Sequence, residues 1–421
     1  FPERYCGDGS RSDCGSVMKH LLIILLLIFI WTYNCFAGNK LNIILMLSDD
    51  LGWPYYGFMY PDGFDGHEPV ITPNLDRLSR RGVTFINGTV AAPMCCPSVE
   101  SILTGLNQRD IIRVNKNGKI DDTKHKFLPE YIRDEGYVTY YAGKPKAFDP
   151  DPYFDYMYKK GRDIGRNGVG PIFDFIEKHH FQGEKKPFFV WYFPRMPHVP
   201  LSAPDYFVTL YPKSEGKRNY FAMISWFDDT VGEIISWLED QELASNTLII
   251  YLTDNGFSLP KSKHKFTENG MRTPIIYYLP GTILPVGQID SLVSSIDILP
   301  TILDFIGANV YKEHHQAGVT LPDSAYLPDS MSLYDLVLGG DNYPTRQYIF
   351  GNWHENSQRS VRSKKYKLYA QEEPIKFFDL INDPTEINDL NGLDIYNSVI
   401  DEYMNILDQW WNSRINPLLV D

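Results

Sequence analysis

Four apolar, β-rich runs, each followed at once by polar or charged residues, constrain the fold of this chain more than any other feature. The runs occupy residues 41–47, 137–141, 188–193 and 247–252. Their apolar residues are continuous rather than alternating, which is typical of strands buried on both faces of a parallel sheet. Helical patterns lie between the runs, at 73–81, 98–103 and 220–238. The sequence therefore predicts an α/β fold, a doubly wound, mostly parallel sheet with helices on both faces.

The character of the chain changes near residue 340. The stretch Gly339-Gly340-Asp341-Asn342 resembles a linker, and it is followed by a short strand pattern at 366–369 and a final helical pattern at 400–411. A chain of 421 residues with 43% hydrophobic content can bury one large core and a smaller second one. We expect a large domain over 38–340 and a small C-terminal α+β subdomain over 341–421.

An export pattern begins at Met18. Lys19 and His20 form a short polar region, an apolar run covers 21–31, and Cys35-Phe36-Ala37 places small residues before a possible cleavage point. A membrane anchor is the alternative, but the run is shorter than the roughly 20 residues that span a bilayer. We predict a signal peptide at 18–37, a non-structural upstream segment at 1–17, no stable membrane span, and a secreted or extracytoplasmic location such as the periplasm, the lysosome or the extracellular space.

Charge and cysteine usage narrow the function further. The 40 basic and 53 acidic residues give a net charge of -13, which argues against nucleic-acid partners. Beyond the predicted signal peptide the only cysteines are Cys95 and Cys96. Adjacent Cα atoms lie about 3.8 Å apart, whereas disulfides need about 4.4–6.8 Å. The pair is therefore expected to serve chemistry, with two buried apolar thiols as the alternative.

Acidic and amide side chains follow the first and last of the four runs. Asp49 and Asp50 come after the first run, and Asp254 and Asn255 come after the last. A single strand that ends in Asp is often only a polar exit into a loop. Ligands of doubly wound sheets bind beyond the carboxyl ends of the strands, however, so these side chains should meet in one crevice. Their oxygens are hard donors, and they predict a Ca²⁺ site, with Mg²⁺ as the other possibility.

The segment 95–105 predicts a loop that enters a short helix, with Pro97 in its first turn and Gly105 at its end. Cys95 would then stand at a helix N-terminus, where we expect a lowered thiol pKa and a favourable position for an anion. The other two runs lead to Lys144 and His198, so cationic and imidazole side chains should reach the same crevice.

The spacing Cys-x-Pro-Ser-x-x-x-x-Leu-Thr-Gly at 95–105 resembles the signature of the sulfatase family. Further marks of that family stand in order along the chain, at 49–52, 72–78, 143–144, 197–200, 253–256, 263, 268–274, 297–301, 378–380 and 383–386. The chain is thus similar to arylsulfatases and carbohydrate sulfatases, which share the alkaline-phosphatase superfold. The resemblance implies that 38–340 is a sulfatase-like catalytic domain.

The resemblance also implies a reaction and its residues. A formylglycine-generating enzyme would convert Cys95 to formylglycine, whose hydrate attacks the sulfur of a sulfate ester on a small molecule or carbohydrate. The metal ligands would be Asp49, Asp50, Asp254 and Asn255, together with the modified Cys95. Lys144 and Lys263 would clamp the sulfate and His198 would polarise or protonate the leaving oxygen, so that these three act with Cys95 in catalysis. Lys146 would join the substrate-binding set of Lys144, His198 and Lys263.

Two positions depart from the family pattern. The family has Arg four residues after the cysteine, where this chain has Val99, and it has Trp-His after Gly-Lys, where this chain has Pro145-Lys146. Val99 removes a cation that the maturation enzyme is expected to read; an arginine introduced there would have Glu100 as a possible partner. Three functions stay open: sulfate-ester hydrolysis, binding of sulfated glycans by a catalytically impaired relative, and phosphate-ester hydrolysis on the same metal site.

Overall fold

The computed structural model describes residues 40–64, 66–114, 120–144, 149–158, 164–257, 262–308, 318–320, 326–340, 346–353, 358–370 and 374–413. The predicted upstream segment, the predicted signal peptide and Lys146 lie outside these residues. No helix in the described ranges combines the length and the apolar content that crossing a membrane requires.

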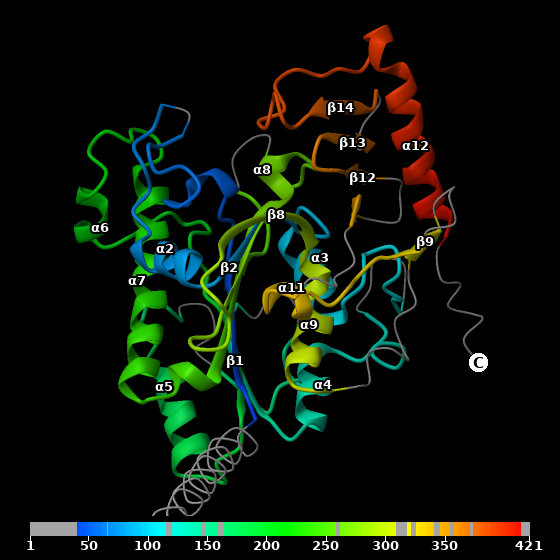
Figure 1. The fold of residues 1–421 in the computed structure, drawn as a ribbon. Helices are drawn as coiled ribbons and strands as arrows, with labels where there is room; N and C mark the ends of the chain where they lie inside the picture. Colours follow the sequence, from blue (N-terminus) through cyan, green and yellow to red (C-terminus); the bar gives the residue numbers. More distant parts are fainter. Residues whose placement is uncertain are drawn as a thin grey trace, which may run out of the picture. The chain divides into compact units, whose positions relative to one another are not determined.

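A large sheet organises the described part of the chain (Figure 1). Its strands lie in the order β4-β3-β5-β1-β6-β7-β2-β8. The strands are β1 (Asn42–Ser48), β2 (Val83–Thr89), β3 (Val138–Gly143), β4 (Tyr156–Met157), β5 (Phe188–Phe193), β6 (Thr247–Thr253), β7 (Arg272–Tyr278) and β8 (Gly287–Ser294). β1 pairs in parallel with β5 and β6, while β7 runs antiparallel to both of its neighbours. The predicted mostly parallel sheet is confirmed.

Helices cover both faces of this sheet (Figure 1), as predicted. Successive side chains of a strand point to opposite faces, so Ile44 and Met46 of β1 pack in one apolar layer while Ile43 and Leu45 pack in the other. The first layer includes α2 (Pro73–Arg81), α5 (Gly170–Ile176) and α7 (Arg218–Asp240), and the second includes α3 (Cys95–Thr104), α4 (Leu128–Asp134), α9 (Ile298–Phe305) and α11 (Tyr334–Val337). Two shorter helices are α6 (Asp205–Thr209) and α8 (Glu268–Met271).

The start of α2 shows how local sequence and packing agree. Pro73 occupies the first turn, where its missing N–H costs nothing. The backbone N–H groups of Asn74 and Leu75 donate to the buried carboxylate of Asp228 on α7, at 3.0 and 2.7 Å. An anion at a helix N-terminus satisfies donors that the helix itself leaves unpaired. The helix spans 73–81, as the sequence predicted.

The C-terminal residues form a second, antiparallel sheet with its own apolar cluster. Its strands are β11 (Ile349–Asn352), β12 (Arg359–Arg362), β13 (Tyr366–Ala370) and β14 (Lys376–Asp379), and α12 (Asn397–Asn412) packs on them. β9 (Gly318–Thr320) and β10 (Tyr326–Pro328) form a separate two-stranded pair. A small sheet with a final helix is the α+β arrangement predicted for this end of the chain.

A buried ionic cluster joins α8 to this second sheet. The carboxylate of Glu268 accepts two hydrogen bonds of 3.0 Å from Arg362 on β12 and one of 2.9 Å from Lys367 on β13. Burial acts to raise the pKa of Glu268, but Arg362 and Lys367 outweigh it and hold the pKa below its ordinary value. The carboxylate is therefore charged, and it is the nearest counter-charge of both cations, with Glu386 3.7 Å from Lys367 as a second one.

Substituting Glu268→Gln is expected to lower the free energy of unfolding by about 3–5 kcal/mol, because two buried cations would lose their nearest counter-charge. Equilibrium unfolding in urea measures the change. Asp290→Asn is the matched control, since it breaks an exposed ion pair with Lys364 and should cost less than about 1 kcal/mol. Equal effects of the two substitutions would contradict the prediction.

Candidate active site

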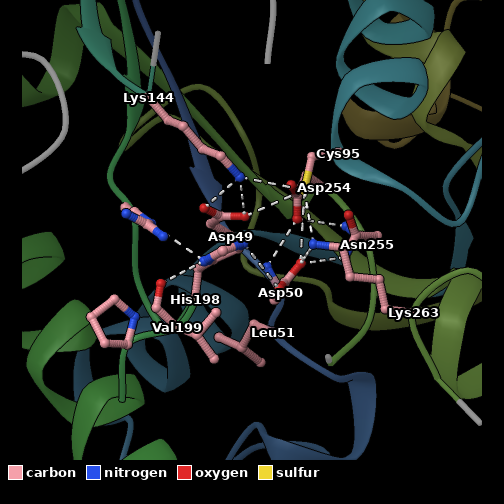
Figure 2. A network of polar contacts seen from close by, with 12 residues as sticks. Asp49, Asp50, Leu51, Cys95, Lys144, His198, Val199, Asp254, Asn255 and Lys263 are labelled. Atoms are coloured by element: carbon pink, nitrogen blue, oxygen red, sulfur yellow. Dashed lines mark hydrogen bonds and ion pairs between the residues drawn. The ribbon is translucent and has the colours of Figure 1, made fainter. Parts of the chain in front are cut away.

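The carboxyl ends of β1 and β6 bring four oxygen-bearing side chains together. Ser48 pairs with Thr253 in the parallel ladder, so Asp49 and Asp50 follow one strand where Asp254 and Asn255 follow its neighbour. All four are fully buried, with 0% exposure. One ligand atom from each of Asp49, Asp50, Asp254 and Cys95 lies within 4.8 Å of the others. The convergence that the strand ends predicted is present, and Figure 2 shows these side chains pointing toward one another.

Hydrogen bonds among these side chains determine which of their oxygens remain available to bind a metal ion. Asp50 has a backbone φ of 68°, an uncommon conformation for this residue type. It lets the backbone N–H of Asp50 donate to Oδ1 of Asp254 at 3.0 Å, and Nδ2 of Asn255 donates to Oδ1 of Asp50 at 2.6 Å. Oδ2 of Asp254 and Oδ1 of Asn255 are buried and have no hydrogen-bond partner among the described residues. Buried oxygens of this kind need a partner of another sort.

The donor set fits a hard divalent cation. Burial and the neighbouring carboxylates of Asp49 and Asp50 raise the pKa of Asp254 well above its ordinary value, because concentrating buried negative charge is unfavourable. A divalent cation would offset this charge and would take up the two unpartnered oxygens. A cluster that could hold a divalent metal is therefore present, while the complete ligand set and the identity of the metal stay predictions.

Cys95 is the first residue of α3, and its Sγ lies 3.6 Å from Oδ1 of Asp49. The ammonium groups of Lys144 and Lys263 lie 3.4 and 3.1 Å from the same sulfur. Burial, followed by the charges of Asp254 and Asp49, raises the thiol pKa well above its ordinary value. The predicted lowering of this pKa was wrong, because burial beside the carboxylates outweighs the helix N-terminus.

The two lysines extend toward Cys95 from different sides of the crevice (Figure 2). Lys144 lies 2.9 Å from a carboxylate oxygen of Asp49, and Lys263 lies 2.6 Å from one of Asp50. Burial acts to lower the pKa of each lysine, but the surrounding anionic groups outweigh it and raise both values. Both side chains are therefore fixed cations next to the predicted nucleophile.

His198 lies at the edge of the carboxylate cluster. Its Nε2 is 3.7 Å from Oδ2 of Asp50, and its Nδ1 is 2.8 Å from the carbonyl oxygen of Val199. Nε of Arg195 also approaches Nδ1, at 3.3 Å. The structure thus brings His198 to the same crevice as Cys95, Lys144 and Lys263.

Arg166 holds the loop that carries His198, a role that the sequence motifs do not indicate. Its Nη2 donates to the carbonyl oxygens of Arg195, His198 and Pro200, at 3.0, 3.1 and 3.2 Å. The contact spans about thirty positions of sequence and follows no periodic pattern, so reasoning from local motifs could not find it. Arg195 lies three residues before His198 in an irregular segment, and only the fold shows that the two side chains touch.

Val99, the position of the missing signature arginine, is fully buried in the apolar layer that contains α3. Its neighbour Glu100 is already paired, since Nη2 of Arg113 donates to it at 2.6 Å. Arg113 also donates to Gln108, whose Nε2 donates to the carbonyl oxygen of Pro97 at 2.6 Å. Glu100 is therefore already paired with Arg113, and its pairing with an arginine introduced at position 99 stays a prediction.

Comparison with known proteins agrees with this geometry. The sulfatase family model matches residues 41–308, and a model of the N-sulphoglucosamine sulphohydrolase C-terminal region matches 262–412. An arylsulfatase of Clostridium perfringens is 23% identical over 87% of this chain and 94% of its own length. A solved protein in complex with its substrate D-glucosamine-2-N,6-O-disulfate aligns with a TM-score of 0.73 at 18% identity, over 91% of this chain and all of the other.

The same fold also carries related chemistry. A phosphonate monoester hydrolase of Agrobacterium radiobacter aligns with a TM-score of 0.68 at 18% identity, over 89% of this chain and 96% of the other. At this identity the structural likeness speaks for the fold alone, whereas the family model covers more than half of the chain. This chain belongs to the sulfatase family, the enzymes that hydrolyse sulfate esters.

Proposed function

We propose that this protein hydrolyses sulfate esters of carbohydrates, with a formylglycine made from Cys95 and one Ca²⁺ or Mg²⁺ bound by Asp49, Asp50, Asp254 and Asn255. The observation that carries the proposal is the environment of Cys95, whose sulfur lies against buried carboxylates and within 3.4 Å of two ammonium groups. A carbohydrate substrate is supported by the solved relative that binds a sulfated glucosamine.

Each side chain has a chemical task in this proposal. The formylglycine hydrate would supply the oxygen that attacks sulfur, while the cation would polarise it and the sulfate oxygens. Lys144 and Lys263 hold positive charge on two sides of the reacting group, where sulfate oxygens carry negative charge. His198 points its Nε2 into the crevice, where it can donate a proton to the leaving oxygen. Burial excludes water and strengthens these electrostatic contacts.

Two further parts of the proposal concern the localisation of the protein and its maturation. The export pattern at 18–37 supports work outside the cytoplasm, and modification of Cys95 requires a formylglycine-generating enzyme as a partner. The rival functions are binding of sulfated glycans without turnover, which Val99 favours, and phosphate-ester hydrolysis, for which the phosphonate monoester hydrolase fold is a precedent.

The modification state of Cys95 separates these functions. We expect the rate of sulfate release from a sulfated saccharide to rise in proportion to the fraction of formylglycine that mass spectrometry finds in the Cys95 peptide. Cys95→Ala should abolish release while leaving the fold intact. Full modification without sulfate release would favour the glycan-binding rival. Release by preparations that contain only the free thiol would show that the proposed nucleophile is wrong.

Removing either lysine should slow the reaction without unfolding the protein. Lys263→Ala and Lys144→Ala are each expected to lower kcat/KM for a sulfate ester by about 10- to 100-fold, because a charge-assisted contact to an anion contributes about 1.5–3 kcal/mol. Lys217→Ala is the control, since Lys217 is a partly buried lysine whose Nζ donates to the hydroxyl of Tyr55 at 2.8 Å. Unchanged kcat/KM in Lys263→Ala would remove that lysine from the site.

A further inference from the structure

The chain turns sharply just after Lys263. His264 has a backbone φ of 67°, a left-handed conformation that histidine tolerates better than most residues. Its backbone N–H donates to the carbonyl oxygen of Pro93 at 2.9 Å. Lys263 therefore reaches Cys95 with its ammonium group, while the imidazole of the next residue lies exposed to solvent beside the same loop.

Trp353 arrives at this loop from the second sheet. It follows Asn352, the last residue of β11, whose backbone N–H donates to the carbonyl oxygen of Ala91 at 3.1 Å. The Trp353 side chain packs against the cluster of Val90, Phe266 and Met271 and stays partly exposed. Both His264 and Trp353 are thus anchored to the short stretch 90–93 that leads into the nucleophile.

The two rings face each other in a stacked arrangement, with centroids 5.3 Å apart and an angle of 29° between their planes. Aromatic side chains whose positions are fixed by contacts of their own segment lose little conformational entropy when a ligand binds. His264 directly follows Lys263, the proposed sulfate-binding lysine, so the ring pair lies at the loop that carries this lysine to Cys95.

We propose that His264 and Trp353 form a stacking subsite for the sugar ring that carries the sulfate. One face of a pyranose ring presents C–H groups, which pack favourably on a flat aromatic surface. This inference rests on the proposed carbohydrate substrate and adds the residues that select it: Lys144 and Lys263 hold the sulfate, while the aromatic pair holds the ring bonded to it.

Binding measurements in a Cys95→Ala background, where the proposed reaction does not proceed, test the subsite without turnover of the probes. The probes are sulfated mono- and disaccharides, including D-glucosamine-2-N,6-O-disulfate, and inorganic sulfate, all measured by isothermal titration calorimetry with full-length protein. Trp353→Ala and His264→Asn should each weaken saccharide binding tenfold or more and leave sulfate binding within twofold. Asparagine is chosen because it also accepts a positive φ. Trp353→Phe should retain most of the saccharide affinity.

Trp237→Ala is the matched control. Trp237 also stacks on an aromatic ring, that of Phe173, at 4.7 Å, but it lies near the far end of α7. Its substitution should change neither affinity. Unchanged saccharide affinity in Trp353→Ala and His264→Asn would overturn the subsite, as would an equal loss of sulfate affinity, which would indicate a structural role. If the wild-type protein binds saccharides through these residues but releases no sulfate, the subsite stands and the proposed hydrolysis fails.

Discussion

Asp254→Asn is expected to lower sulfate-ester turnover by about a thousandfold or more and to abolish stoichiometric binding of a divalent metal. A metal ion that stabilises transition-state charge contributes several kcal/mol, and about 4 kcal/mol corresponds to a thousandfold in rate. Asparagine preserves the shape of the side chain and can still accept the hydrogen bond from the backbone of Asp50, so the loss follows from charge rather than from packing. Elemental analysis of the purified protein measures the metal content.

Compared with the wild-type protein, Asp254→Asn should be more stable in the presence of a chelator and less stable in the presence of excess metal. Asp254 is a buried carboxylate that Asp49 and Asp50 repel, so removing its charge should raise the melting temperature in the presence of a chelator. It should also remove the stabilisation by added metal, which is about 2.7 kcal/mol at a hundred times Kd.

Asp228→Asn is the control for these measurements, because Asp228 is equally buried but serves the start of α2. It should lose stability and keep its metal. A full metal complement in Asp254→Asn would contradict the assigned ligand set.

Val99→Arg is expected to raise the formylglycine content of Cys95 from a minor to a major fraction and to increase sulfatase activity tenfold or more. Position 99 lies one turn after Cys95 on the same face of α3, so the new guanidinium can extend toward Asp49 and Asp50. Because Val99 is fully buried, the larger side chain should also cost about 1–3 kcal/mol of stability through overpacking.

Val99→Met separates the two effects, since it fills similar space without a charge. It should reproduce part of the destabilisation and leave Cys95 mostly unmodified. Wild-type protein that already carries formylglycine in nearly every molecule, when expressed beside an ordinary formylglycine-generating enzyme, would contradict the prediction and show that valine suffices at this position.

Much of the site could be read from the sequence because it depends on strand ends. A continuous apolar run indicates a buried strand. Because neighbouring strands are parallel, the residues that follow them, such as Asp49 and Asp254, lie at the same edge of the sheet. The helix over 73–81 could also be predicted from the sequence, since Pro73 stands in its first turn and Gly82 at its C-terminal end. Both cases rest on local pattern combined with one general rule of topology.

The remaining features depend on contacts between segments that no local pattern connects. The pKa of Cys95 is raised by burial and then by the carboxylates that follow β6 and β1, which come from distant parts of the chain. Glu100 is paired with Arg113, which follows α3. Trp353 follows a strand of the second sheet and stacks on His264, which lies in the loop before α8. The antiparallel direction of β7 could not be predicted either. A strand that is buried on both faces has the same continuous apolar run whichever way it points.

The buried cluster around Glu268 has a consequence for the order in which the protein is made. Helix α8 holds the loop after Asn255 through a hydrogen bond from the backbone of Gly256 to Gly270. The closest cations to Glu268 of that helix are Arg362 and Lys367, which lie about 100 residues further along the chain. Lys367 leaves the ribosome about 270 residues after Cys95, which is roughly 15–55 s of synthesis. The nucleophile position therefore emerges early, and its surroundings become rigid only when the last part of the chain has been translated.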